Sequence, residues 1–436
     1  MIIKNYKSLA VNNIRKKALK IIDAGFEAIK TENVLRDNII LQNENLKIGN
    51  KVFNLNGFEK IFVIGFGKVA FKAAFFLEKI LGKKISGGAV IDIENGKLKF
   101  IKSFKGTHPY PSAKNIKATR EISLILKNAG KKDLIIVIVS GGGSVLLCDP
   151  GNIPVSFLKS VIQELFIKGA DIKEINIIRK HLSEIHGGNF AKLAYPATVV
   201  SLIFSDIPFK DLGLVASGPT FLDKTTRKDA EKISEKHILG SPVLTRAFKE
   251  TPKNVKYFKK VFNILMVDNL TALKAMKKEA EKLGLKADII NSCLRGEAKE
   301  IGPFIVKKFD QRFSQRFHRK NSVIFFGGET TVKIKNPGKG GRNQELVLSA
   351  LPFLKSNQLI ASIASDGKDN IKEAAGALAD YQTLIKAGRQ NLNPEIFLKN
   401  NNSYAFFKAV GDVIITGNTG SNVSDLIIMI NGESQV

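Results

Sequence analysis

Glycine, serine, lysine and acidic residues collect directly after apolar, β-branched segments of this sequence. Five such ends occur, namely Gly65-Phe66-Gly67-Lys68, Ser140-Gly141-Gly142-Gly143-Ser144, Ser205-Asp206, Gly327-Gly328-Glu329 and Ser365-Asp366-Gly367. In open α/β sheets, ligands bind in the crevice outside the carboxyl ends of the strands. Because these ends fall in both halves of the chain, we expect a ligand site in a cleft between two domains.

The first of these ends, IGFGKVA, matches the dinucleotide pattern G-x-G-x-x-A after a strand, with Asp92 at the end of the next strand. A single match of this kind is weak evidence for nicotinamide binding. Lys68 stands at the start of the following helix, where a cation opposes the helix dipole and calls for an anion. Gly65, Gly67 and Lys68 are therefore expected at a phosphate. The alternative is a solvated lysine.

The loop from Ser140 to Ser144 (SGGGS) offers unhindered backbone N–H groups in a turn, which suit phosphate oxygens. Three successive glycines lose conformational entropy on folding, which makes a purely structural connection the weaker explanation. We expect Ser140, Gly141, Gly142, Gly143 and Ser144 to bind a cofactor phosphate. The P-loop pattern is absent, since Lys68 precedes a valine, and this disfavours a P-loop NTPase.

A second glycine-rich loop, NPGKGGR, covers residues 336–342 and leads into a helix. Gly340 and Gly341 are expected at a cofactor, and the Arg342 guanidinium matches phosphate oxygens in a bidentate manner. A surface hairpin turn is the alternative.

Three carboxylates at predicted strand ends, Asp206, Glu329 and Asp366, are the candidate metal ligands. Few hard oxygen ligands suit a magnesium ion that keeps water and substrate phosphates. Each carboxylate alone is more often a helix N-cap. The histidines are expected to cap or to stabilise structure, and the two cysteines to fill core space.

Strands alternate with helical segments along the chain, which predicts an α/β fold whose parallel or mixed sheets are covered on both faces. The strands are expected at residues 61–67, 88–92, 134–140, 198–206, 262–268, 287–291, 322–329, 359–366, 412–417 and 425–430, with helices at 68–81, 156–169 and 175–195. Prolines and charged residues gather between 219 and 260. We therefore expect two α/β/α sandwich domains, 1–245, which is Rossmann-like, and 255–436.

Composition excludes several classes of protein. The chain has 436 residues, 44% of them hydrophobic, with two cysteines and no CxxC pair, so a disulfide framework and a structural zinc site are disfavoured. Apolar runs are shorter than the ~18 residues of a membrane span, and a cytoplasmic protein is expected. The net charge is +28, and the lysines occur singly along the chain rather than in one dense block. No motif for stacking on nucleic-acid bases accompanies them. We expect no nucleic-acid or membrane partner, and a monomer or homodimer that attracts small anions.

Eight blocks in order resemble the glycerate 2-kinase family, which has a large N-terminal domain and a C-terminal MOFRL domain. They are GFGKVA, GTHPYPSAKN, VSGGGSVLLCDP, IIRKHLSEIHGG, SLIFSDIPFKDLGLVASGPT, GGETTVKIKNPGKGGRNQE, SDGKDNIKEAAGALAD and ITGNTGSNVSDL. The resemblance spans nearly the whole chain. It implies ATP-dependent phosphorylation of D-glycerate at its 2-hydroxyl with a divalent cation, Mg²⁺. It also implies that Lys68 and Arg342 are the family's catalytic lysine and arginine.

We expect these two cations to converge on the γ-phosphate and Asp206 to orient or deprotonate the glycerate hydroxyl. Arg179 or Lys180 is expected to receive the glycerate carboxylate. The alternatives are an NAD(P)H-dependent hydroxypyruvate reductase, a label also used in this family, and a binding protein without activity. The sequence departs from the family pattern at a few positions, and these are Ser112, Phe209, Lys210, Asn370 and Asn418.

Overall fold

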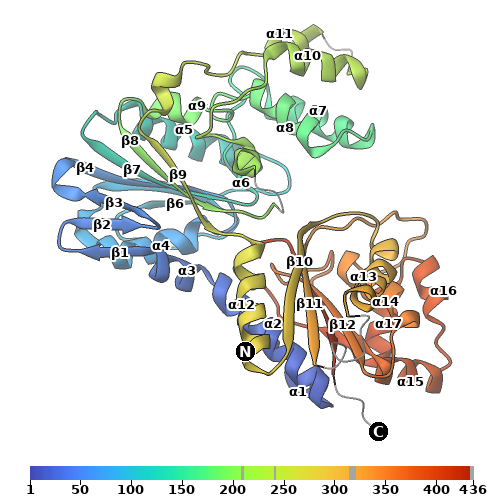
Figure 1. Cartoon of the computed structure of the whole chain (residues 1–436). Coiled ribbons are helices and arrows are strands. Elements are labelled where there is room, and N and C mark those ends of the chain that lie inside the picture. The colour runs from blue at the N-terminus through green and yellow to red at the C-terminus, as the bar shows by residue number, and fades with distance from the viewer. Residues whose placement is uncertain (208–210, 240–241, 314–320, 433–436) are drawn as a thin grey trace. The chain divides into compact units, whose positions relative to one another are not determined.

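The computed structural model describes residues 1–207, 211–239, 242–313 and 321–432. The chain forms two compact units (Figure 1). Unit 1 consists of Met1–Asn33, a short segment that begins at Asp206, and the chain from Val267 onward. Unit 2 contains Val34–Ser205 and the stretch that ends at Met266. The sequence predicted domains at 1–245 and 255–436, which assigns residues 1–33 to the N-terminal domain. In the structure these residues belong to unit 1, together with the C-terminal part of the chain. As limits of independently folding domains, those bounds stay a prediction.

Unit 2 is built on a six-stranded sheet of order β6-β5-β4-β7-β8-β9, in which β4, β5, β6, β7 and β8 run parallel. Its strands are β4 (Lys60–Phe66), β5 (Gly87–Asp92), β6 (Lys102–Lys105), β7 (Asp133–Ser140), β8 (Thr198–Phe204) and β9 (Val261–Val267). Every residue of β7 and β8 is buried, as expected for strands covered on both faces. This strand order is that of a Rossmann-type sheet, so the prediction of a Rossmann-like N-terminal domain is confirmed.

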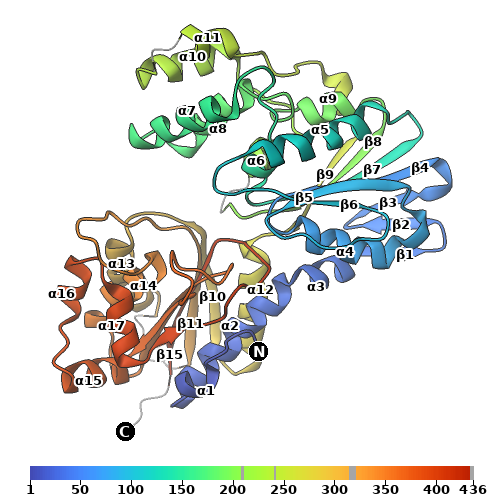
Figure 2. The ribbon, with the colours of Figure 1, turned by 180° about the vertical axis from the view of Figure 1, so that it is seen from behind.

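Helices cover both faces of the unit 2 sheet. Figure 2 shows α4 on one face and α5 and α9 on the other. The helices of this unit are α4 (Ala70–Leu81), α5 (Ala113–Lys127), α6 (Gly143–Leu146), α7 (Val155–Ile167), α8 (Ile172–His181), α9 (Asn189–Ala194), α10 (Arg227–Lys236) and α11 (Pro242–Ala247). A single helix was expected over residues 175–195. The chain instead turns between α8 and α9, where Gly187 and Gly188 adopt positive φ values of 58° and 86°.

Three short strands precede β4 and form an antiparallel sheet that the sequence did not predict. They are β1 (Ile39–Gln42), β2 (Asn45–Ile48) and β3 (Lys51–Asn54). Alternate residues of β2 are buried, but asparagine and lysine fill its other positions. The apolar run of β1, Ile39–Leu41, has three residues, which is shorter than the run that predicts a buried strand. They follow α3 (Thr31–Asn38), the helix that leads from unit 1 into unit 2.

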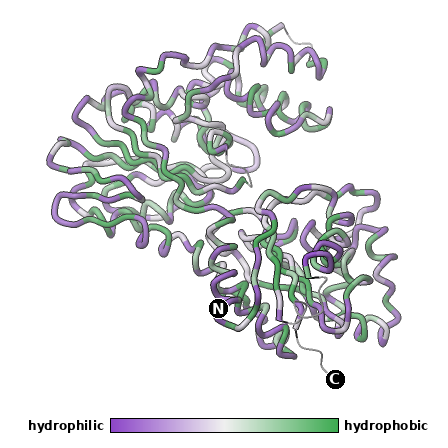
Figure 3. Tube along the Cα trace, viewed as in Figure 1, coloured by the Kyte–Doolittle hydropathy of each residue, from purple (hydrophilic) through white to green (hydrophobic). Residues whose placement is uncertain are grey.

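Unit 1 is built on a mixed six-stranded sheet of order β10-β11-β15-β12-β13-β14. Only β10 and β11 pair in parallel, and the other neighbours are antiparallel. The strands are β10 (Lys286–Leu294), β11 (Ser322–Gly328), β12 (Gln358–Ala364), β13 (Gly376–Asp380), β14 (Val413–Ile414) and β15 (Asp425–Asn431). The sequence did not predict β13, whose alanines and glycine lack the β-branched residues typical of strands. In both units, hydrophobic residues are concentrated along the strands of the sheet (Figure 3).

The helices of unit 1 form a layer on each face of its sheet. In Figure 1, α2 and α12 lie against one face and α13, α14 and α17 against the other. These helices are α1 (Tyr6–Leu9), α2 (Asn13–Ile29), α12 (Asn269–Lys282), α13 (Ala298–Arg312), α14 (Arg342–Ala350), α15 (Tyr381–Arg389), α16 (Pro394–Lys399) and α17 (Ser403–Val410). Among the described residues, no helix is long and apolar enough to cross a bilayer.

A buried ion-pair network explains why the N-terminal segment belongs to unit 1. The Arg15 guanidinium on α2 is fully buried and donates to Asp380 Oδ1 at 2.6 Å and to Asp412 Oδ1 at 2.6 Å. The hydroxyl of Thr383 accepts a further bond from Arg15 at 3.0 Å. Because a buried charge is strongly destabilised without its partner, this network holds α2 to residues almost 400 positions later in the chain.

Candidate functional site

The turn between β4 and α4 lies at the point of the unit 2 sheet where the strand order reverses. Gly67 has φ +114°, and a Cβ there would stand 2.2 Å from Ser140 Oγ, so only glycine fits. The Lys68 backbone N–H donates to the Gly141 carbonyl at 2.9 Å, which joins this turn to the loop after β7. Ligands of open α/β sheets bind beside such a reversal point. The side chain of Lys68 is half-buried and pairs with no carboxylate among the described residues.

Gly65 and two glycines of the SGGGS loop, Gly142 and Gly143, have a conformational or packing reason to be glycine. A Cβ at Gly65 would approach a Val90 methyl to 2.8 Å, and one at Gly143 would approach Ala216 Cβ to 2.7 Å. Gly142 has φ +79°, and a Cβ there would lie 3.2 Å from Lys68 Cγ. These close approaches bring the loop and the Lys68 side chain together. Phosphate binding by the loop stays a prediction.

The side chains around this loop are engaged locally. Ser140 Oγ accepts the Val69 N–H at 3.2 Å, and the Ser144 hydroxyl accepts a bond from Ser217 at 3.0 Å. His108 lies against Gly142, where burial and the Lys68 charge lower its pKa to about 4. A neutral imidazole therefore stands beside the lysine at physiological pH.

Asp92, the acidic residue of the dinucleotide-like pattern, is turned toward its own backbone. It is 2% exposed, and its carboxylate accepts the N–H groups of Phe71 at 3.0 Å and Ile93 at 2.6 Å. Burial raises its pKa to about 6, against the opposing effect of these hydrogen bonds. Its oxygens support the first turn of α4, and this use competes with a ribose hydroxyl.

An arginine held by two carboxylates forms the centre of the unit 1 site. Arg342 is the first residue of α14, and its Nε and Nη2 donate to Asp425 Oδ2 and Oδ1 at 2.6 and 3.0 Å. Its Nη1 lies 3.1 Å from Glu329 Oε1. The sequence predicted an anionic partner for this arginine, and the protein supplies carboxylates. About a third of the Arg342 side chain remains exposed.

Further carboxylates surround this arginine. Partial burial raises the pKa of Glu329 above its ordinary value, while Arg342 acts in the opposite direction. Three nearby negative charges add to the increase, those of Asp425, Asp206 and Asp366. Burial likewise raises the pKa of Asp425 against the effect of its arginine. Carboxylates that repel one another in this way are a donor set that a divalent cation would relieve.

The predicted metal ligands therefore gather in one unit. Within the described parts of the chain, no three acidic, histidine or cysteine side chains stand ready to hold an ion by themselves. This arrangement fits magnesium, which is commonly bound through one or two carboxylates together with waters and substrate phosphates. A magnesium site at Asp206, Glu329 and Asp366 stays a prediction.

The GKGGR loop is held close to the rest of unit 1. A Cβ at Gly340 would stand 2.2 Å from Ser403 Oγ, and one at Gly341 would stand 2.2 Å from the Asp369 carbonyl. The buried Asp369 carboxylate accepts the backbone and side-chain N–H groups of Asn343 and Gln344 at 2.9–3.1 Å. It thereby caps α14 and fixes the backbone that carries the neighbouring arginine.

Asp425 and Asp369 are the two site residues that the sequence reasoning missed. An available signal was the acidic residue at the first position of the fully buried strand DLIIMIN. A charge at the end of such a strand is stable when it is paired, and this indicates a cationic partner.

Two cations at the end of α8 behave differently. Lys180 Nζ donates to Asp223 Oδ1 at 3.1 Å in a largely buried pair. Arg179 lines a pocket of unit 2, and its hydrogen-bond partners are neutral, Asn176 at 3.3 Å and Ser217 at 3.5 Å. Arg179 and Lys180 are the two residues predicted to bind the glycerate carboxylate. Among the described residues, Lys180 pairs with a protein carboxylate and Arg179 does not.

Three departures from the family pattern have local explanations. Ser112 is the N-cap of α5, in a capping box with Asn115. Asn370 adopts φ +64°, a conformation that glycine and asparagine tolerate, and it donates to the Gly340 carbonyl at 3.0 Å. Asn418 accepts the Gly420 N–H at 3.1 Å. Phe209 and Lys210 lie outside the described residues.

The Rossmann-type sheet, the lysine at its reversal point and the arginine–carboxylate cluster are typical of enzymes that act on phosphorylated ligands. Residues 17–249 match the model of a domain of unknown function, DUF4147, and residues 322–425 match the MOFRL family. The chain belongs to the glycerate 2-kinase family.

Full-length relatives agree with this assignment. The chain is 35% identical over 434 residues to a glycerate 2-kinase of Pyrococcus horikoshii, with 96% of this chain and 97% of the relative covered. The crystal structure of a glycerate kinase from Thermotoga maritima superposes with a TM-score of 0.86 at 32% identity, covering 96% of this chain and 99% of that one. A relative from Agrobacterium vitis, 37% identical over 342 residues and covering 76% of this chain and 78% of its own, bears hydroxypyruvate reductase as a provisional name.

Proposed function

We propose that this protein transfers the γ-phosphoryl group of ATP to the 2-hydroxyl of D-glycerate, forming 2-phosphoglycerate and ADP. Membership of the family and relatives named glycerate 2-kinase support the reaction. The observation that carries the proposal is the cluster of Arg342 with Asp425 and Glu329. Phosphoryl transfer depends chiefly on positioned charges, and a guanidinium fixed along one edge is such a charge.

Arg342 and Lys68 supply the positive charge in this proposal. Asp425 fixes Nε and Nη2 of Arg342, so that the guanidinium loses little freedom when it meets a phosphate oxygen. Lys68 is held at its backbone by Gly141 and carries a charge that no described carboxylate matches. The two residues belong to different units, and their action on one phosphoryl group stays a prediction.

Asp206, Glu329 and Asp366 would hold the divalent cation. When bound, Mg²⁺ supplies charge neutralisation at the phosphate oxygens. A carboxylate oxygen of Asp206 accepts the proton of the glycerate 2-hydroxyl. Its backbone carbonyl already accepts the Ser424 hydroxyl at 2.5 Å, which ties this residue to the strand that begins at Asp425.

Arg179 receives the glycerate carboxylate in this scheme, because Lys180 is neutralised by Asp223. A guanidinium binds a carboxylate through two parallel hydrogen bonds, which fixes the orientation of the acid.

The reductase alternative is favoured by the names of two relatives and by the IGFGKVA pattern. Against it, the Asp92 carboxylate caps α4 and is 2% exposed. A dinucleotide enzyme of this type uses such a residue on the ribose hydroxyl.

An assay with two arms separates the two functions. The protein is incubated with D-glycerate, ATP and Mg²⁺, with ADP release measured and the phosphorylated carbon assigned by NMR. In parallel it is incubated with hydroxypyruvate and NADH. We expect ADP release with phosphate at C2 and no NADH oxidation. NADH oxidation without ADP release would refute the kinase proposal.

The Lys68→Met variant tests the role of the lysine. We expect a loss of about 10³-fold in kcat, the scale known for cations that stabilise phosphoryl transfer. Lys72→Met is the matched control, since this lysine lies exposed on α4. Turnover of Lys68→Met within tenfold of the wild-type value would remove Lys68 from the catalytic residues.

A further inference from the structure

A pocket in unit 2 has a more apolar lining than a three-carbon hydroxy acid requires. It lies between α7, α8 and the loops that follow β6 and β7. Apolar side chains form most of its wall, among them Val145, Leu158, Ile162, Leu182 and Pro109. Glycerate carries an oxygen on every carbon, so it gains little from contact with such a wall.

Arg179 is the charged residue that identifies the kind of ligand. Its guanidinium lines the pocket and bonds to the neutral groups of Asn176 and Ser217. Burial lowers its pKa to about 10, which still leaves it charged at physiological pH. Arg179 is half-buried, and although Asp149 also lines the pocket, its guanidinium pairs with no carboxylate among the described residues. A guanidinium in this state suits a bound anion.

A second, independent observation comes from His186, which also lines this pocket. The side chain is 2% exposed, and its Nδ1 bonds to the Ser183 hydroxyl at 2.9 Å. The buried Nε2 has no hydrogen-bond partner at normal geometry among the described residues. Burial and the charges of Arg179 and Lys180 lower the pKa of His186 to about 3, so the ring is neutral. Its free nitrogen suits a hydroxyl group of a ligand.

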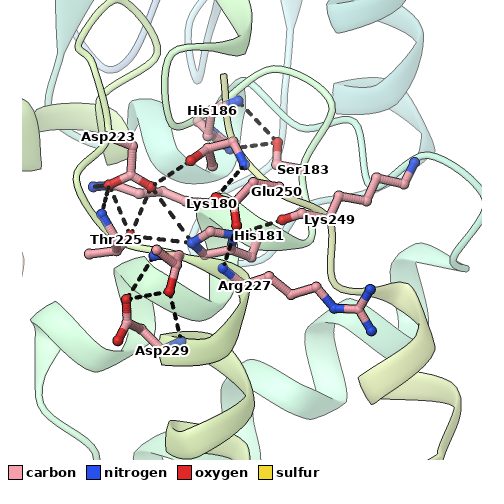
Figure 4. Close-up of polar contacts among 12 residues, drawn as sticks. Lys180, His181, Ser183, His186, Asp223, Thr225, Arg227, Asp229, Lys249 and Glu250 are labelled. Atoms are coloured by element: carbon pink, nitrogen blue, oxygen red, sulfur yellow. Dashed lines mark hydrogen bonds and ion pairs between the residues drawn. The ribbon is translucent and has the colours of Figure 1, made fainter. Parts of the chain in front are cut away.

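The neighbouring ion pair explains why Arg179 keeps its unmatched charge. Figure 4 shows Asp223 among Lys180, His181 and Thr225. Asp223 Oδ1 accepts bonds from Lys180 at 3.1 Å and from the Thr225 hydroxyl at 2.9 Å. Burial opposes ionisation of Asp223, but Lys180 and Thr225 hold its pKa below the ordinary value. Asp223 is thus committed to fixing the end of α8 through its ion pair with Lys180.

The pocket adjoins Lys68, one of the residues proposed for phosphoryl transfer. Ser144 and Val145 in its wall follow Gly143, and Lys68 and His108 lie against the preceding Gly142. An acid whose carboxylate meets Arg179 therefore has its functional end beside the SGGGS loop. Its remaining carbons face the apolar wall.

We propose that this pocket binds 2-hydroxy acids whose third carbon carries an apolar substituent, with the carboxylate on Arg179 and the 2-hydroxyl at His186 Nε2. The inference rests on the proposed function, because it takes Arg179 as the carboxylate receptor of that site and extends its substrate class beyond glycerate.

The test measures binding by calorimetry on the full chain without nucleotide, with lactate, 2-hydroxybutanoate and 2-hydroxy-4-methylpentanoate as probes. Burial of one methylene changes affinity by about fourfold. We expect 2-hydroxy-4-methylpentanoate, which has three carbons more than lactate, to bind at least tenfold more tightly than lactate. A difference below threefold overturns the proposal. The amide of the same acid is expected to bind at least tenfold more weakly than the acid, and equal binding overturns the role of the carboxylate.

Three variants localise the effect. Arg179→Met retains the apolar stem and is expected to lose tenfold or more in affinity for every acid, together with the preference for acid over amide. Lys173→Met, an exposed lysine of the same helix, is the matched control and is expected to bind as the wild type does. Leu158→Phe fills the apolar end and is expected to abolish the preference for the branched acid over lactate, while lactate binding reports that the variant is folded. Unchanged binding by Arg179→Met, or an unchanged preference in Leu158→Phe, overturns the proposal.

Failure of this inference is distinguishable from failure of the proposed function. If the protein phosphorylates glycerate but shows no preference for apolar acids, the pocket assignment alone is wrong. If the binding pattern holds and no acid is phosphorylated, the pocket assignment stands without the kinase.

Discussion

Replacement of Arg342 by methionine removes the arginine that pairs with Asp425, whose side chain is 3% exposed. Breaking a buried pair in this way costs about 3–5 kcal/mol, because one charge remains uncompensated. Unit 1 has a size at which 1 kcal/mol corresponds to about 2–4 °C in Tm. For Arg342→Met we therefore expect Tm to fall by roughly 6–20 °C at pH 7.

The loss depends on pH in a defined direction. Burial already raises the pKa of Asp425 in the folded protein, and removal of the arginine raises it further. A carboxyl group whose folded-state pKa exceeds its unfolded value stabilises the protein at low pH and loses that contribution as pH rises through the folded pKa. The difference in Tm between wild type and Arg342→Met should therefore be small near pH 5 and grow toward pH 8.

Thermal unfolding followed by circular dichroism checks this reasoning. Arg312→Met is the matched control, since Arg312 forms an exposed pair with Asp288 at 2.9 Å and is expected to shift Tm by little at any pH. The double variant Arg342→Met/Asp425→Asn should recover at least half of the loss, because it removes the stranded charge. Equal Tm values for the two single variants, or a gap that stays constant from pH 5 to pH 8, would refute the argument.

Three further predictions concern stability. Arg15→Met should destabilise unit 1 by about 3 kcal/mol or more, since it leaves the buried Asp380 without its cation and Asp412 with Lys386 alone. A lowered Tm together with faster proteolysis of the N-terminal helix would be measured, and a wild-type Tm would contradict the role of this network. Gly67→Ala should lower Tm by several degrees, because Gly67 has φ +114° and the new Cβ would stand 2.2 Å from a hydroxyl oxygen. Gly57 has open space around it, so Gly57→Ala should leave Tm unchanged. Identical effects of the two substitutions would disprove the close approach. Asp92 has a folded-state pKa of about 6, so roughly 3 kcal/mol of unfolding free energy should be lost as pH rises from about 4 through 6. Chemical unfolding of Asp92→Asn should show no such loss. If the unfolding free energy of the variant still falls over this pH range, other groups are responsible.

Much of the sheet architecture was predictable from local pattern. The run LIIVIVS predicted a strand that is buried on both faces, and β7 covers it with every residue buried. The strands β1 to β3 could not be predicted in this way, because each has four residues and their apolar residues do not follow one regular alternation. Likewise β13 is made of small residues, and only its neighbours β12 and β14 give it the partners of a strand.

The sequence predicted which residues form the candidate site better than it predicted which of them contact one another. Binding of phosphate oxygens by Arg342 stays a prediction, whereas its partner within the chain, which the sequence did not predict, is Asp425, 83 positions away. Glycines such as Gly341 were interpreted as ligand-binding, and the structure gives them a packing reason. A short pattern cannot distinguish these two uses, because both demand the absence of a side chain.

The sequence by itself determined the α/β class, the positions of the main strands and the residues that end them, because these follow from hydrophobic periodicity and turn chemistry over a few residues. Only the tertiary structure decided which charges are matched. It paired Lys180 with Asp223 and left Arg179 with neutral partners, and it joined Arg15 to two carboxylates of the C-terminal segment. The physical reason is that the state of a buried charge depends on the atoms within a few ångströms of it, and long-range folding alone brings those atoms there.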